Sequence, residues 1–109
     1  MVAFHVSPKK HLNSIQSKGL IPKIGPRAKL LGESNKSIYL FPSKDDVDTA
    51  LMNWLGDELD DEDIIIMVID LAGIDYQIEG YEIILTEVID PSRIMKIMDE
   101  EAWIDYTRP

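Results

Sequence analysis

His5, Tyr39 and Glu82 are among the side chains of this chain whose types could take part in binding or chemistry. Each stands in a short β-prone run, which would hold its side chain in a fixed direction. A fixed imidazole can hydrogen-bond sugar hydroxyls, an aromatic face can hold a flat cation, and a carboxylate can stabilise positive charge. Because the three residues are far apart in the chain, this chemistry requires a fold that brings them together.

Each of these residues also has a purely structural interpretation. His5 suits a half-buried position on a strand, with Ser7 acting only as a helix cap. Tyr39 suits packing inside or at the edge of a sheet, and Glu82 suits the solvent face of a strand. Glu87, which follows Glu82 and is expected on the opposite pleat, is a rival carboxylate.

A long irregular segment separates the first helix from the next strand. The prolines and glycines in residues 20–37 predict a loop, with a helical turn at residues 28–31. Loops of this length often carry function, so a ligand-covering segment is expected here. Arg27, in the turn Gly25-Pro26-Arg27, could grip phosphate oxygens in a bidentate fork. An exposed loop arginine without a partner is the alternative.

Other chemistries lack the residues that they need. The absence of cysteine excludes disulfides, thiolate metal sites and a cysteine nucleophile. The spacing of His5 and His11 matches no zinc motif, and the acidic run at residues 57–63 lacks the glycine and closing glutamate of an EF-hand loop. No glycine-rich phosphate loop or G-x-S-x-G turn is present. We therefore expect no bound metal.

The elements that would position the candidate residues follow from the hydrophobic pattern. Residues 2–6 predict an opening strand, and a helix follows with Ser7 as its N-cap and Pro8 at its first position. Gly19 ends that helix. Residues 38–41 predict the next strand.

A second helix is predicted from Ser43, which forms an N-terminal box with Asp46. Five residues form its apolar stripe, namely Val47, Ala50, Leu51, Trp54 and Leu55. Gly56 is expected to end this helix.

The second half of the chain is richer in strands. Residues 64–71 predict a strand buried on both faces, and residues 81–89 and 94–98 predict two more. Residues 73–80 read as a connection, and the acidic tail is unassigned. This order, with two main helices, predicts an α+β fold with a compact, mixed and mostly antiparallel sheet rather than a doubly wound one.

Length and charge narrow the class of protein. The 109 residues fit one domain, 1–109, and no apolar run approaches the about 20 residues that span a bilayer. No signal-peptide pattern opens the chain, so a cytoplasmic location is expected. The net charge of −9 disfavours stable nucleic-acid binding. Lysines and arginines concentrate in the first third, where they could form a basic side that docks an anionic ligand.

Taken in order, several segments resemble the signature segments of ADP-ribosyltransferases of the diphtheria-toxin and poly(ADP-ribose) polymerase branch. They are Phe4-His5-Val6-Ser7, residues 12–20, residues 37–41 with the helix after them, and Gly80-Tyr81-Glu82-Ile83-Ile84-Leu85. The resemblance covers most of the chain by the order and spacing of its elements. It implies an ADP-ribosyltransferase-like fold of a small bacterial or phage type.

The resemblance also implies a substrate and roles for named residues. The substrate would be NAD, with ADP-ribose transferred to a protein or nucleic-acid acceptor and nicotinamide released. His5 and Ser7 would bind the ribose and amide end of NAD, and Tyr39 would stack on the nicotinamide ring. Trp54 lies where the family often places a second pocket residue, although its place on the apolar stripe favours core packing. Glu82 would bond the 2′-hydroxyl of the nicotinamide ribose and stabilise an oxocarbenium-like centre.

Arg27 is the candidate for meeting the NAD pyrophosphate. Val6 departs from the small residue usual in the polymerase branch, and Gly80 stands where arginine-modifying members carry Glu or Gln, which disfavours arginine modification. One alternative is a non-catalytic binding or inhibitor module that presents the acidic run at residues 57–63 to a basic partner. Another is an RNA 2′-phosphotransferase-like enzyme, which shares the fold and needs basic residues around a phosphate.

Overall fold

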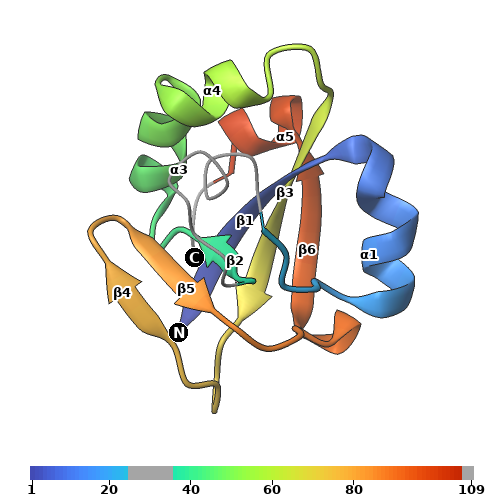
Figure 1. The fold of residues 1–109 in the computed structure, drawn as a ribbon. Helices are drawn as coiled ribbons and strands as arrows, with labels where there is room; N and C mark the ends of the chain where they lie inside the picture. The colour runs from blue at the N-terminus through green and yellow to red at the C-terminus, as the bar shows by residue number, and fades with distance from the viewer. Residues whose placement is uncertain (25–35, 107–109) are drawn as a thin grey trace.

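The computed structural model describes residues 1–24 and 36–106, which form an α+β fold with two antiparallel sheets (Figure 1). The first sheet has the strand order β1-β3-β6 and the second has the order β2-β5-β4. The strands are β1 (Val2–Pro8), β2 (Ile38–Leu40), β3 (Ile64–Asp70), β4 (Gln77–Glu79), β5 (Glu82–Leu85) and β6 (Ile94–Asp99). The helices are α1 (Leu12–Lys18), α3 (Lys44–Leu51), α4 (Trp54–Glu58) and α5 (Glu100–Ile104), with 3-10 turns η1 (Lys9–His11) and η2 (Pro91–Arg93).

The α+β class is therefore confirmed, whereas the expectation of one mixed sheet is wrong. The strands of each sheet pair among themselves, and β1 meets β2 through the bridge between Phe4 and Phe41. The described residues form four α-helices, in which the two expected main helices correspond to α1 and α3, whereas α4 and α5 have five residues each. None of them combines the length and the apolar character that a bilayer-spanning helix needs.

The central strand β3 confirms the predicted strand buried on both faces. Residues 64–69 are all buried, and β1 and β6 pair with β3 on its two sides. Side chains alternate along a strand, so β3 contributes to two separate clusters. Ile65, Met67 and Ile69 join a cluster with α1 and the second sheet. Ile66 and Val68 join a cluster with α3, α4 and α5 on the opposite face.

The predicted start of the first helix is wrong, because the two residues assigned to it belong to β1. Ser7 and Pro8 continue β1 and pair with Ile65 and Ile64, so Ser7 is not an N-cap. The reason is that pairing with the long buried strand β3 outweighs the local Ser-Pro signal. Gly19 does end α1 as predicted, with a φ of 79°.

The predicted helix after Ser43 is broken in two. Ser43 caps α3 by accepting a hydrogen bond from the Asp46 backbone, as expected. The chain leaves helical geometry at Asn53, and α4 begins at the next residue. Gly56 lies inside α4 rather than ending it. A Cβ at this position would lie 1.9 Å from the Leu51 carbonyl oxygen, so a residue without a side chain is needed here. The glycine therefore lets α4 approach the end of α3 closely.

The later strand boundaries also differ from the prediction. The connection at residues 73–80 contains β4, whose residues are all exposed. The predicted strand at residues 81–89 narrows to β5, because residues 86–88 are exposed and only Ile89 forms a further bridge, with Leu20. Residues 94–98 lie in β6 as expected. The unassigned tail forms α5, capped by Asp99 and anchored by buried Trp103.

Candidate functional site

A cavity of about 940 Å³ lies between the first sheet, α1, the second sheet and α4. This volume falls in the range of about 300–1,000 Å³ that is typical of ligand pockets. Five residues singled out from the sequence line it, namely His5, Ser7, Tyr39, Trp54 and Glu82. The fold thus brings together side chains that are up to 77 positions apart in the chain.

The register of the second sheet explains why Tyr39 and Glu82 face the same space. Tyr39 pairs with Ile84, and Glu82 lies two residues from Ile84 on β5. Paired residues project to the same face of a sheet, as do residues two apart on one strand. Ile83 and its partner Leu40 project to the opposite face and are fully buried. Alternation therefore makes Tyr39 and Glu82 diagonal neighbours on one face, and the backbone positions of such neighbours are about 7–8 Å apart.

His5 reaches this sheet through its side chain. Its Nδ1 bonds the Tyr39 carbonyl oxygen at 2.8 Å. Backbone hydrogen bonds alternate in direction along a strand. Ser37 and Phe41, two positions on either side of Tyr39, direct theirs away from β5, so the Tyr39 carbonyl also faces away from β5, toward β1. A carbonyl oxygen can only accept, so Nδ1 carries the hydrogen. The first strand and the second sheet are thereby joined at the candidate site.

The same contact decides what the His5 ring can offer a ligand. Desolvation by burial lowers the pKa of His5 from 6.5 to about 4, although the bond to the Tyr39 carbonyl opposes the shift and the nearby charge of Lys23 adds to it. The ring is therefore neutral at pH 7. In a neutral ring with hydrogen on Nδ1, Nε2 is a hydrogen-bond acceptor. A ligand hydroxyl or N–H in the cavity is its natural partner.

Ser7 and Trp54 form further parts of the wall. Ser7 follows His5 by two residues and so shares its face of β1, and its hydroxyl donates to the Pro8 carbonyl at 3.4 Å. Trp54 opens α4 and lies with its ring 6.4 Å from that of Phe41, at the edge of the core. It serves both the packing predicted from the apolar stripe and the lining of the cavity.

Two sequence candidates do not join this arrangement. Glu87 is exposed in a bend beyond β5 and is not among the described residues that line the cavity, so its expected place on the opposite pleat is wrong. The strand ends at Leu85, which leaves Glu87 without a pleat to occupy. Arg27 and the predicted turn at residues 28–31 lie outside the described residues.

Lys23 and Glu79 are among the charged residues of the cavity wall that the sequence did not single out. Lys23 bridges Ser37 through two backbone hydrogen bonds, and Glu79 pairs with Glu82 across β4 and β5. Glu79 lies in the connection where no strand was predicted, so no periodic signal marked it. Lys23 was seen only as one of many early lysines.

The described residues contain no group of three or more His, Cys, Asp or Glu side chains arranged to hold a metal ion. A comparison with protein-family models and with curated proteins finds no match for this chain. The candidate site therefore has to be interpreted from its own geometry.

Proposed function

We propose that this protein is an NAD-dependent mono-ADP-ribosyltransferase-like enzyme that transfers ADP-ribose to a macromolecular acceptor and releases nicotinamide. The observation that carries the proposal is that His5, Tyr39 and Glu82 line one cavity. An ADP-ribosyltransferase-like fold is part of the same proposal. It is supported by the order of the signature segments along β1, α1, β2, α3 and β5.

The chemistry of the wall suits the nicotinamide riboside half of NAD. Nε2 of the neutral His5 ring can accept a hydrogen bond from a ribose hydroxyl, and the Ser7 hydroxyl lies on the same face. The face of Tyr39 can hold the flat cationic ring of nicotinamide. A neutral imidazole has a further advantage here, because it adds no positive charge next to a sugar that is itself becoming positive.

The reaction then needs charge stabilisation rather than a metal. The bond between the nicotinamide nitrogen and the ribose anomeric carbon breaks, and both electrons leave with nicotinamide. The carboxylate of Glu82 would accept a hydrogen bond from the 2′-hydroxyl and stabilise the oxocarbenium-like centre. An oxygen or nitrogen of the acceptor bonds the anomeric carbon and loses its proton to solvent. If water attacks instead, the product is free ADP-ribose.

The experiment measures nicotinamide release from NAD by the purified protein and by two matched variants. In Glu82→Gln we expect a rate about 100-fold to 1,000-fold lower, because a charge-stabilising group at the reacting carbon is lost. Glu87→Gln is the control, since this exposed glutamate lies outside the described cavity wall and its loss should leave the rate unchanged. Equal rates in the two variants, or no NAD binding at millimolar concentration, would overturn the proposal.

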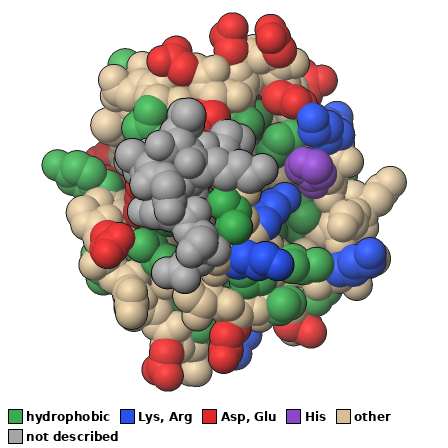
Figure 2. Space-filling model, viewed as in Figure 1, with side chains coloured by type: hydrophobic (Ala, Val, Ile, Leu, Met, Phe, Trp, Pro, Cys, Tyr) green, Lys and Arg blue, Asp and Glu red, His purple; other side chains and the backbone are tan. Residues whose placement is uncertain are grey.

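A second function is favoured by the exposure of the acidic run. Asp57, Glu58, Asp60, Asp61 and Asp63 are all exposed. Figure 2 shows acidic side chains gathered along the top of the molecule, over α4 and the turn that leads to β3. Such a surface could bind a basic partner without catalysis. This function predicts salt-sensitive binding to a cationic protein that survives Glu82→Gln and is lost when the run is changed to Asn and Gln.

A further inference from the structure

The cavity wall formed by the second sheet separates opposite charges. Lys23 pairs with Ser37 on one side of β2, β5 lies on the other side of β2, and β4 follows it. Lys23, on a bridge beside β2, and Glu79, on the outer strand β4, therefore stand on opposite sides of the second sheet. Neighbouring strands are about 4.8 Å apart, so three spacings separate the two edges by about 14 Å.

The same alternation that directs Tyr39 into the cavity also directs these edge residues. Ser37 is two residues before Tyr39 and shares its face, and Lys23 is paired with Ser37. On the other edge, Glu79 is paired with Glu82. All five line the cavity. The row runs from an ammonium, through a hydroxyl and a phenol, to two carboxylates.

The two lysines of the described cavity wall differ in whether a carboxylate pairs with them. Lys10, the other lysine of the cavity wall, is paired with Glu62 at 2.7 Å. Lys23 has no carboxylate partner within residues 1–24 and 36–106, although the chain carries a net charge of −9. Like charges directly opposite each other, as at Glu79 and Glu82, are unfavourable in a sheet. A ligand that brings an anion to the Lys23 edge would give this ammonium a partner.

We propose that Lys23, with the hydroxyl of Ser37 beside it, is the subsite for a phosphate group of the ligand, and that Glu79 joins Glu82 in facing its cationic ring. The proposal rests on the proposed function for the identity of the ring, but the phosphate subsite stands on the position of Lys23 alone. Such a subsite would set the orientation of the ligand in the cavity. The diphosphate of a nucleotide lies toward the Lys23 edge, and the nicotinamide ring lies toward β4. Figure 2 shows lysine or arginine and histidine side chains gathered on the α1 side of this face, which would favour the approach of an anion from there.

Calorimetric titration with ADP and with adenosine tests the phosphate subsite, because the two ligands differ only in the diphosphate. In Lys23→Gln we expect the Kd for ADP to rise about tenfold, since a charge-assisted hydrogen bond is lost, and the Kd for adenosine to stay unchanged. Lys23→Arg keeps the charge and should retain most of the ADP affinity. Lys18→Gln is the matched control, as Lys18 is exposed at the end of α1 and is not among the described residues of the wall.

The outcomes separate this inference from the proposed function. ADP binding that weakens in Lys23→Gln but not in Lys18→Gln supports the subsite, even if the protein releases no nicotinamide from NAD. Equal ADP affinity in both variants, or no ADP binding by the unaltered protein at millimolar concentration, overturns it, even if NAD is cleaved. For the other edge, Glu79→Gln should weaken NAD binding more than ADP binding, because only NAD carries the cationic ring. An equal effect on both ligands would overturn that part.

Discussion

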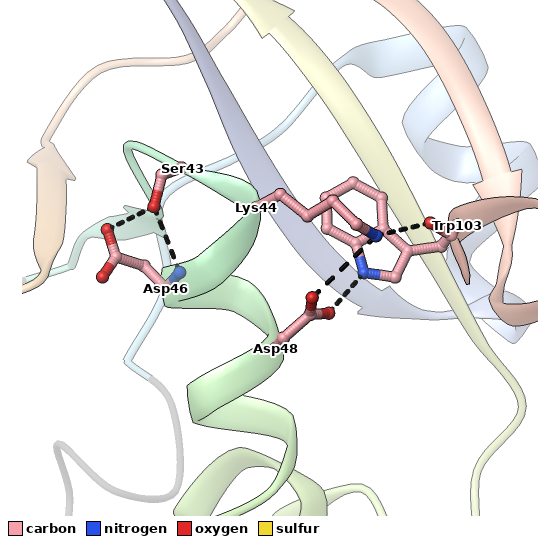
Figure 3. A network of polar contacts seen from close by, with 5 residues as sticks. All are labelled: Ser43, Lys44, Asp46, Asp48 and Trp103. Atoms are coloured by element: carbon pink, nitrogen blue, oxygen red, sulfur yellow. Dashed lines mark hydrogen bonds and ion pairs between the residues drawn. The ribbon is translucent and has the colours of Figure 1, made fainter. Parts of the chain in front are cut away.

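The two faces of the first sheet differ in where their polar groups find partners. On one face, α3 and α5 meet in a closed corner formed by Lys44, Asp48 and Trp103 (Figure 3). The Trp103 indole N–H donates to Asp48 at 2.8 Å, and the Lys44 ammonium donates to the Trp103 carbonyl at 2.6 Å while lying 4.0 Å from the ring centre. On the other face, the cavity wall holds His5 with an acceptor nitrogen to offer and Lys23 without a carboxylate partner in the described chain.

The difference shows how one sheet can support both stability and binding. In the closed corner the polar groups bond one another, so the network joins two helices that are far apart in the sequence. In the cavity the polar groups are held by neighbouring backbone but keep bonding capacity for a ligand. Changes in the closed corner should therefore lower stability, whereas changes in the cavity should alter binding first.

The largest loss of stability is expected from Trp103→Ala. Trp103 is 3% exposed and stacks on Tyr106 with ring centres 5.5 Å apart, so its removal should lower the free energy of unfolding by about 3–5 kcal/mol. Trp54→Ala is the comparison from the cavity, and its partly exposed ring should cost less. Urea unfolding measures both. A greater loss in Trp54→Ala would contradict the division between the two faces.

The next largest effect is a dependence of stability on pH that comes from His5. Its pKa of about 4 in the folded protein lies below the 6.5 of an unfolded histidine, so the unfolded state takes up the proton first as the pH falls. The contribution of His5 is fully present above pH 6.5 and declines by up to about 1.4 kcal/mol per unit toward pH 4, where it levels off. His5→Asn should remove this part of the profile, as measured by urea unfolding from pH 4 to 7.5. An unchanged slope would show that the ring is not held neutral.

A smaller effect is expected when the acceptor in the closed corner is removed. Asp48→Ala leaves the buried Trp103 N–H without its partner, which should lower the free energy of unfolding by about 1–3 kcal/mol. Asp48→Asn retains an acceptor oxygen and should lose less. Thermal unfolding of the two variants measures the difference, and ADP affinity should be the same in both. A change in ADP affinity would show that the two faces are coupled.

The smallest effect is expected at the rim of the cavity. Lys10→Gln breaks the 2.7 Å ion pair with Glu62, in which the lysine side chain is 61% exposed. Exposed pairs contribute about 0.2–1 kcal/mol, so the free energy of unfolding should fall by no more than that. ADP affinity should fall less than in Lys23→Gln, because Lys10 already has a carboxylate partner. A larger loss of ADP affinity than in Lys23→Gln would overturn the assignment of the phosphate subsite to Lys23 and indicate Lys10 instead.

Local signals in the sequence were reliable where neighbouring residues alone decide the conformation. Ser43 caps α3, Gly19 ends α1 at a positive φ, and the aliphatic run of β3 is buried on both faces. The same kind of signal was misleading where distant pairing competes with it. Ser7 and Pro8 carry a helix-start pattern, yet they extend β1 because β3 offers backbone partners to them. Gly56 fits the sequence pattern of a helix end, yet it lies inside α4 and permits a close approach between two helices.

The sequence by itself determined which side chains are available for chemistry, their order along the chain and the alternation that turns Tyr39 toward one face and Leu40 toward the other. Only the tertiary structure decided that His5 bonds the Tyr39 carbonyl, that Glu82 rather than Glu87 joins them, and that Lys23 lies at the edge of the same sheet. The physical reason is that alternation is a property of each strand alone, whereas register between strands depends on backbone hydrogen bonds formed by residues far apart in the chain.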